Sequence, residues 1–83
     1  MDARQFHQEA ALFVDALCEL KALGPLRVLL PHWPMSMGLT DEWVELARAL
    51  KTVRVQHAGQ IPEELMDRLA SLQHAAESAV NGQ

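Results

Sequence analysis

The segment 29–38 carries the residue types best suited to chemistry. It reads LLPHWPMSMG, with two prolines, a histidine, a tryptophan and two methionines between stretches rich in helix-forming residues. Because proline cannot continue a helix, we expect a non-helical connection here. A solvated loop has no use for these apolar side chains. The segment should therefore either fold back over the core or present an apolar surface to a partner.

Three side chains of this segment are potential metal ligands. Thioether sulfur is a soft ligand suited to Cu(I), imidazole is a common ligand, and an indole face can lie against a cation. The Trp-Pro followed by Met-x-Met resembles, over residues 32–37, the metal-binding stretch of periplasmic copper/silver chaperones of efflux systems. That resemblance implies that His32, Met35 and Met37 bind Cu(I) and that Trp33 caps the ion. The chaperones have one more residue between proline and first methionine, and they are exported β-barrels.

The same residues also fit a protein-binding surface. Tryptophan and methionine are enriched at the centres of interfaces, and contiguous exposed apolar patches usually mark a partner. We predict Trp33, Met35 and Met37 as partner-binding residues, with Trp43 supporting them. The alternative is a hydrophobic lid over a small core, because methionine fills irregular gaps. The lid and the binding surface are compatible interpretations if the lid lies at a dimer interface.

The other reactive side chains form no recognisable site. The four histidines lack the spacing of a zinc site, and there is no glycine-rich phosphate loop and no G-x-S-x-G motif. Cys18 falls on the apolar side of the first predicted helix, so we expect an inert core cysteine. We therefore predict that the protein is not an enzyme and holds no cofactor.

Charge and composition exclude several classes of protein. The 83 residues carry a net charge of −4, and the two terminal thirds are the acidic ones. An acidic chain is a poor non-specific ligand for nucleic acid. No stretch has the length of a membrane span, and no secretory signal opens the chain. With a single cysteine, these features predict a cytoplasmic protein that binds neither nucleic acid nor membrane.

Apolar periodicity predicts a mainly α domain, a three-helix bundle spanning residues 1–83. The helices are expected at 3–23, 41–51 and 62–80, with Asp2 and Thr40 as N-caps and Gly24-Pro25 as a stop. The first stripe is expected to comprise Phe6, Ala10, Phe13, Leu17 and Leu20, widened by Leu12, Val14 and Cys18. The second comprises Trp43, Leu46, Ala47 and Leu50, and the third Leu65, Leu69, Leu72, Ala76 and Ala79.

Two short apolar runs leave a second fold open. Residues 26–30 and 52–56 could form strands, which would make the domain α+β. The similar length and period of 3–23 and 62–80 predict that these helices pack together, within one chain or between two. Small domains often gain stability from self-association, so we expect a homodimer.

These observations favour a small cytoplasmic protein-binding module, such as an adaptor, regulatory subunit or inhibitor. Its surface would be the apolar Trp/Met loop, and its partner another protein. The alternative function is Cu(I) binding through His32, Met35 and Met37.

Overall fold

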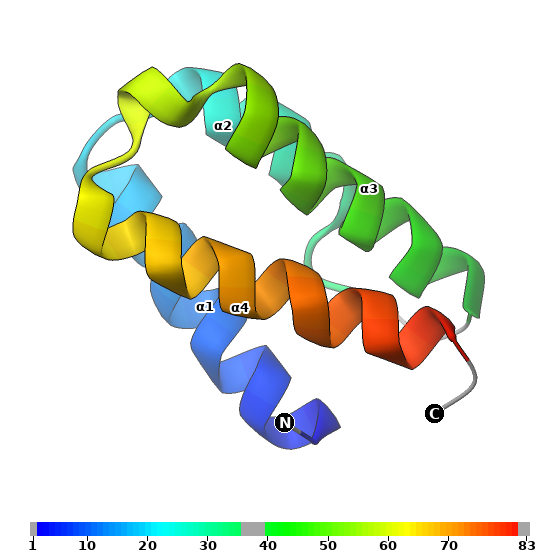
Figure 1. The fold of residues 1–83 in the computed structure, drawn as a ribbon. Coiled ribbons are helices and arrows are strands. Elements are labelled where there is room, and N and C mark those ends of the chain that lie inside the picture. The colour runs from blue at the N-terminus through cyan, green and yellow to red at the C-terminus, as the bar shows by residue number, and fades with distance from the viewer. Residues whose placement is uncertain (1, 36–39, 82–83) are drawn as a thin grey trace.

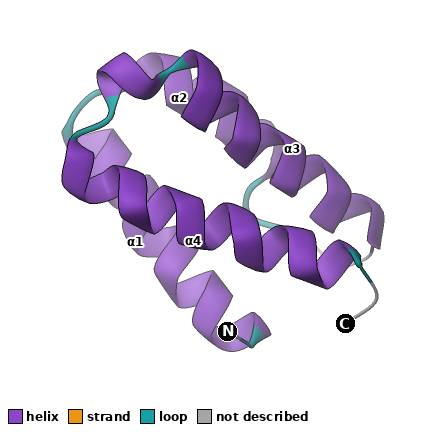
Figure 2. Cartoon of the chain, viewed as in Figure 1, coloured by secondary structure: helices purple, strands orange, loops and turns teal. Residues whose placement is uncertain are grey.

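The described part of the chain, residues 2–35 and 40–81 of a computed structural model, contains helices and no strands. The elements are α1 (Ala3–Glu19), α2 (Leu23–Leu29), α3 (Thr40–Gln56) and α4 (Glu63–Val80), with short 3-10 turns at Leu30–His32 and Ala58–Gln60 (Figures 1 and 2). The prediction of a mainly α protein is confirmed. The count of three helices is wrong, since the described residues form four α-helices.

Helix α1 begins as predicted. The Oδ1 atom of Asp2 accepts a hydrogen bond from the backbone N–H of Gln5 at 2.8 Å, which satisfies one of the donors left free at a helix N-terminus. The buried stripe is the first four residues of the predicted one: Phe6, Ala10, Phe13 and Leu17. Leu12 and Cys18 were predicted to widen this stripe, and both are exposed.

The end of α1 differs from the prediction. The helix ends at Glu19, well before Gly24-Pro25, because Lys21 takes the left-handed conformation with φ 56°. The N–H groups of Lys21 and Ala22 donate to the carbonyls of Cys18 and Leu17. This pair of bonds is a Schellman motif, which glycine usually terminates. Leu20 is then the C-cap and is half exposed.

Residues 26–30, the first candidate strand, are helical instead. Leu26 and Leu29 are buried while Leu30 is 48 % exposed, which is the pattern of a helix that buries every third or fourth residue. Pro25 lies in the first turn of α2, where its missing N–H removes no helical hydrogen bond. A Cβ at Gly24 would lie 2.8 Å from Nδ1 of His57, so glycine allows α2 to pass close to the α3–α4 connection.

Residues 52–56, the second candidate strand, form the last turns of α3. Side chains two apart share a face in a strand but point in nearly opposite directions in a helix. Val53 is completely buried and Val55 is 67 % exposed, so the helix explains both. At the other end of α3, Thr40 is the first helical residue and not the N-cap that the sequence suggested.

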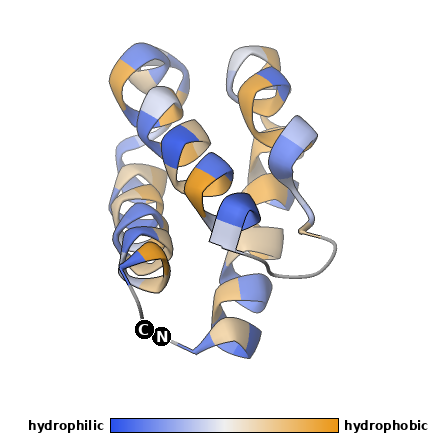
Figure 3. Ribbon diagram, turned by 90° about the vertical axis from the view of Figure 1, so that its right-hand side faces the viewer, coloured by the Kyte–Doolittle hydropathy of each residue, from blue (hydrophilic) through white to orange (hydrophobic). Residues whose placement is uncertain are grey.

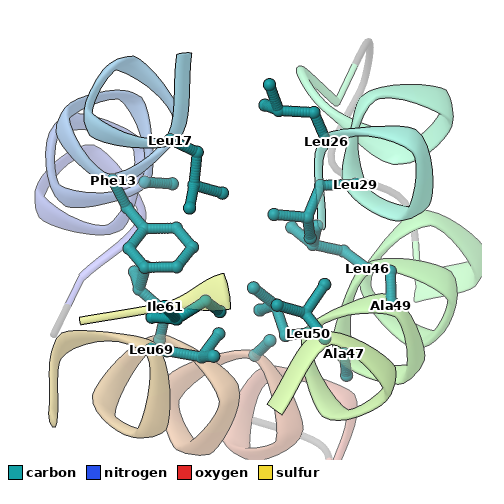
Figure 4. Packing of buried hydrophobic residues seen from close by; sticks show 14 of the residues in the cluster. Phe13, Leu17, Leu26, Leu29, Leu46, Ala47, Ala49, Leu50, Ile61 and Leu69 are labelled. Carbon is teal, nitrogen blue, oxygen red and sulfur yellow. The ribbon is translucent and has the colours of Figure 1, made fainter. Parts of the chain in front are cut away.

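The buried side chains form one cluster to which all four α-helices contribute. In Figure 4, Phe13 and Leu17 of α1 face Leu29 of α2, with Leu50 of α3 completing the ring. Helix α4 packs most extensively against α3, which runs beside it in Figure 1. Helix α4 also contacts α1, as predicted from their matching stripes.

A polar contact between Arg54 and Gln73 crosses the α3–α4 interface. The guanidinium of Arg54 donates to Oε1 of Gln73 at 3.0 Å, and Nε2 of Gln73 donates to Glu77 at 3.0 Å. Gln73 is only 7 % exposed, so these bonds satisfy an amide that would otherwise be costly to bury. The pairing holds α3 and α4 in register.

Candidate functional site: an aromatic-floored cleft

An aromatic cluster forms around Phe6, a buried residue in the second turn of α1. The ring of Trp43 lies edge-on to Phe6 with centroids 4.9 Å apart, and Trp33 lies 6.3 Å from Phe6. His7 stacks at a tilt against Trp33 at 5.2 Å. The two predicted tryptophans therefore both contact the ring of Phe6.

The described part of the Pro-rich segment covers the core. Trp33 is half-buried and borders the core beside Val14 and Leu29. Met35 is buried and belongs to the core cluster. Met37 lies outside the described residues. The positions of Trp33 and Met35 favour the lid over the free binding loop, because neither side chain is left fully exposed.

A cleft opens beside Trp43, with a volume of about 750 Å³. Its floor is aromatic, formed by Phe6 and Trp43. Its walls come from the first turns of α1 and α3 and from the second half of α4: Asp2, Ala3, Thr40, Ser71, His74, Ala75, Ser78 and Ala79. Figure 3 shows the start of α1 and the end of α4 at the same end of the molecule. This volume is typical of binding sites.

The α4 wall of the cleft consists largely of small side chains. Ser71, Ala75, Ser78 and Ala79 succeed each other at helical spacing on one face of α4. Nearer the N-terminal end of α4, the larger side chain of Arg68 reaches Glu9 of α1, with Nε and Oε1 3.9 Å apart. The two helices are thus bridged near Arg68, and the cleft lies beside a part of α4 where His74 is the one large side chain among the lining residues.

The sequence did not point to this cleft. Alanine and serine are ordinary helix-surface residues, so their presence on α4 predicted nothing about function. Of the predicted site residues that the structure describes, Trp43 lines the cleft and Trp33 and Met35 do not. The size contrast between Trp43 and the small side chains of residues 71–79 could have indicated a cleft. That contrast is informative only once α3 is known to pack against α4.

His32 and Met35, the two residues of the copper hypothesis that the structure describes, are not among the residues that line the cleft. His32 borders a shallow hollow of about 220 Å³ together with Pro31, Pro34 and three acidic residues of α3. Met35 is not among the residues that line it. Within residues 2–35 and 40–81, no three His, Cys, Asp or Glu side chains are grouped to hold a metal ion. The helical fold also differs from the β-barrel that the resemblance to copper/silver chaperones implies.

Cys18 corrects a further prediction. It was expected in the core, but it is exposed on α1. A helix turns by about 100° per residue, so Cys18 is rotated away from the buried Leu17. The helix ends one residue later, and Cys18 is left in contact with solvent.

Comparison of the chain with models of protein families, with curated proteins and with solved structures found no match. Among the described helices, none combines the length and the apolar character needed to cross a membrane.

Proposed function

We propose that this protein is a protein-binding module and that the cleft between α1 and α4 receives a helix of its partner. The supporting observation is the cleft itself, which combines an aromatic floor of Phe6 and Trp43 with a wall of small side chains. The lining mixes apolar side chains with polar ones such as Asp2, Thr40 and His74. A groove between helices is a recurrent receptor for an amphipathic helix, which has one apolar and one polar face. Of the residues predicted from the sequence, Trp43 keeps its role as a binding residue.

A helix suits the cleft better than a bulky loop does. Helices pack with their axes about 8–10 Å apart, and the distance depends on the side chains at the contact. The side chains on the α4 wall are short at Ser71, Ala75 and Ser78. The backbone of a partner helix could therefore approach α4 closely. One large apolar side chain of the partner would then reach Trp43 and Phe6 at the floor.

In this proposal, Trp33 and Met35 act indirectly. Trp33 packs on Phe6 from outside the cleft and is not among the cleft-lining residues. It supports the floor against which the partner side chain would rest. The Trp/Met loop is thus a structural element of the binding site.

The experiment is a selection of helical peptides from a displayed library on the immobilised protein. We expect enriched peptides to bind wild type and to lose at least about tenfold in affinity on Ser71→Phe, which places a ring in the cleft. Ala11→Phe is the matched control, because Ala11 is exposed on α1 and is not a cleft residue. Circular dichroism verifies that each variant is folded.

Two outcomes contradict the proposal. Peptides that bind Ser71→Phe as tightly as wild type would place the binding surface elsewhere. A selection that enriches no helical sequence would mean that the cleft receives no helix. Trp43→Ala is the second variant, and it should weaken binding of the same peptides by removing half of the floor.

Two predictions from the sequence remain beside this proposal. Self-association as a homodimer is measured by light scattering coupled to size exclusion. Cu(I) binding through His32, Met35 and Met37 is measured by titration under reducing conditions, with Met35→Leu and Met37→Leu together as the variant.

A further inference from the structure

We infer that the cleft binds helix α2 of a second copy of this chain, so that the copies associate head to tail. This inference rests on the proposed function, because it identifies the helix that the cleft receives. The chain carries two surfaces that suit such a contact. One is the cleft, and the other is the outward face of α2, which is apolar and uncovered. Because both surfaces belong to one chain, the contact needs no other protein.

Helix α2 presents a row of exposed side chains on the side that does not enter the core. Leu23, Arg27 and Leu30 follow one another at spacings of four and three residues, which places them on one face of the helix. The helical backbone continues through Leu30, with φ −60° and ψ −32°. Leu23 is 60 % exposed and Leu30 is 48 % exposed. This α2 face (Leu23, Arg27 and Leu30) is thus an apolar surface that the described chain leaves about half uncovered.

The α2 face matches the cleft in length and in character. Leu23 and Leu30 lie about 10 Å apart along the helix axis, at a rise of about 1.5 Å per residue. By the same measure, the small side chains of the α4 wall extend over about 12 Å from Ser71 to Ala79. The lining of the cleft mixes apolar and polar groups, as does a face with one arginine between two leucines. The α2 face can therefore lie along the α4 wall with a leucine on the aromatic floor.

The contact has to form between two copies. Helix α2 packs against α1 and α3, and it contributes none of the described residues that line the cleft. Figure 1 shows α2 away from the two chain ends, near which the cleft residues Asp2 and Ala79 lie. A copy that uses its α2 face in one contact therefore keeps its own cleft free for another. Such head-to-tail contacts extend from copy to copy unless a ring closes.

The exposed leucines of α1 suit the cleft less well. Leu12 and Leu20 are both about half exposed, but they lie eight residues apart. Asp15 is exposed three residues after Leu12, on the same side of the helix. Its short side chain would carry a charge into the contact, which is costly without a partner. The long stem of Arg27 can instead pack against apolar surface and keep its charged end in water.

The test compares wild type with one variant of each surface. Leu23→Asp places a charge in the α2 face, and Ser71→Phe places a ring in the cleft. Leu12→Asp is the matched control, because Leu12 is 54 % exposed and belongs to neither surface. Sedimentation velocity at increasing protein concentration measures the average mass. We expect the mass of wild type to rise with concentration, and the first two variants to need at least about tenfold more protein for the same rise. The control should associate as wild type does.

A mixture of the two variants gives the sharper result. Leu23→Asp keeps an intact cleft and Ser71→Phe keeps an intact α2 face, so together they can form one contact and no more. We expect each variant to stay monomeric at a concentration where the equimolar mixture forms a 1:1 dimer. Amide chemical shifts in the mixture should change around Trp43 and Ser78 of the Leu23→Asp chain and in α2 of the Ser71→Phe chain. Circular dichroism verifies folding, and Ser78→Phe replaces Ser71→Phe if that variant is unfolded.

Four outcomes overturn the inference. Wild type that stays monomeric at millimolar concentration lacks the contact. Association that Ser71→Phe leaves intact does not use the cleft, and association that Leu12→Asp weakens as much as Leu23→Asp does not use the α2 face specifically. A mixture of the two variants that forms no dimer means that the two surfaces do not meet. The proposed function is tested separately: a helical peptide that binds wild type and not Ser71→Phe supports it even when the chain does not self-associate.

Discussion

Replacement of Trp33 by alanine distinguishes a lid from a free binding loop. A free loop residue contributes to partner binding and little to stability. Trp33 instead packs against Phe6 and His7 and borders the core. We therefore expect Trp33→Ala to destabilise the protein itself.

The size of this effect follows from the burial of the side chain. A buried aromatic side chain removes about 150–250 Å² from water, so a half-buried tryptophan removes roughly 100 Å². At about 25 cal/mol per Å², this corresponds to about 2 to 3 kcal/mol of unfolding free energy. For a domain of this size the melting temperature should fall by about 10 to 20 °C.

Thermal denaturation followed by circular dichroism at 222 nm measures the change. Leu23→Ala is the control, because Leu23 is 60 % exposed, and we expect it to change the free energy by less than about 1 kcal/mol. If Trp33→Ala has the same melting temperature as wild type, the interpretation of Trp33 as a lid over the core is wrong. In that case the indole would have no stabilising contact with Phe6, and the loop would again be the leading candidate for a binding surface.

Three further predictions test the fold. Lys21→Gly should stabilise the protein by about 0.5 to 1 kcal/mol, because glycine adopts the left-handed conformation without strain. Lys51→Gly, in the interior of α3, should instead destabilise the protein by about 1 kcal/mol. Thermal melting curves measure both changes. Val53→Ala should lower the free energy of unfolding in urea by about 1 to 3 kcal/mol, and Val55→Ala should leave it nearly unchanged. Equal losses for the two variants would contradict a helix over residues 52–56. Because Cys18 is exposed, it should react with a thiol reagent as fast in the native protein as in urea. A slower reaction in the native protein would show that Cys18 is buried.

The strongly periodic parts of the fold could be predicted from the sequence, and the helix ends could not. The stripes centred on Phe13 and on Leu69 specified two helices and their packing, since burial follows the 3.6-residue period. The end of α1 depends on Lys21 adopting a conformation that the sequence would assign to Gly24. The valines of 52–56 alternate, but α3 continues through them, with Val53 in the core cluster and Val55 exposed.

The candidate site was only partly predictable, for a different reason. Trp43 was identified by its residue type, which is informative wherever a large aromatic side chain stands on a short helical chain. The α4 wall of the cleft consists largely of alanine and serine, whose small side chains leave space beside the helix. These residues are common on helix surfaces, so their presence in the sequence does not indicate a cleft. A cleft between helices depends on the size of side chains on two elements that are far apart in the chain. Asp2 of α1 and Ser78 of α4 meet there only because both helices pack on the same core.

The shared contact with Phe6 also decides how binding experiments must be interpreted. Trp43 touches Phe6 from within the cleft and Trp33 touches the same ring from outside it. Loss of either indole removes support from the floor, so either variant can weaken binding of a helical peptide. The two cases separate once affinity is compared with stability. Trp33→Ala should lose affinity only as far as the floor becomes disordered, and osmolytes that restore the fold should restore binding. Trp43→Ala removes a surface that the peptide itself would contact, so its binding should stay weak when the fold is restored.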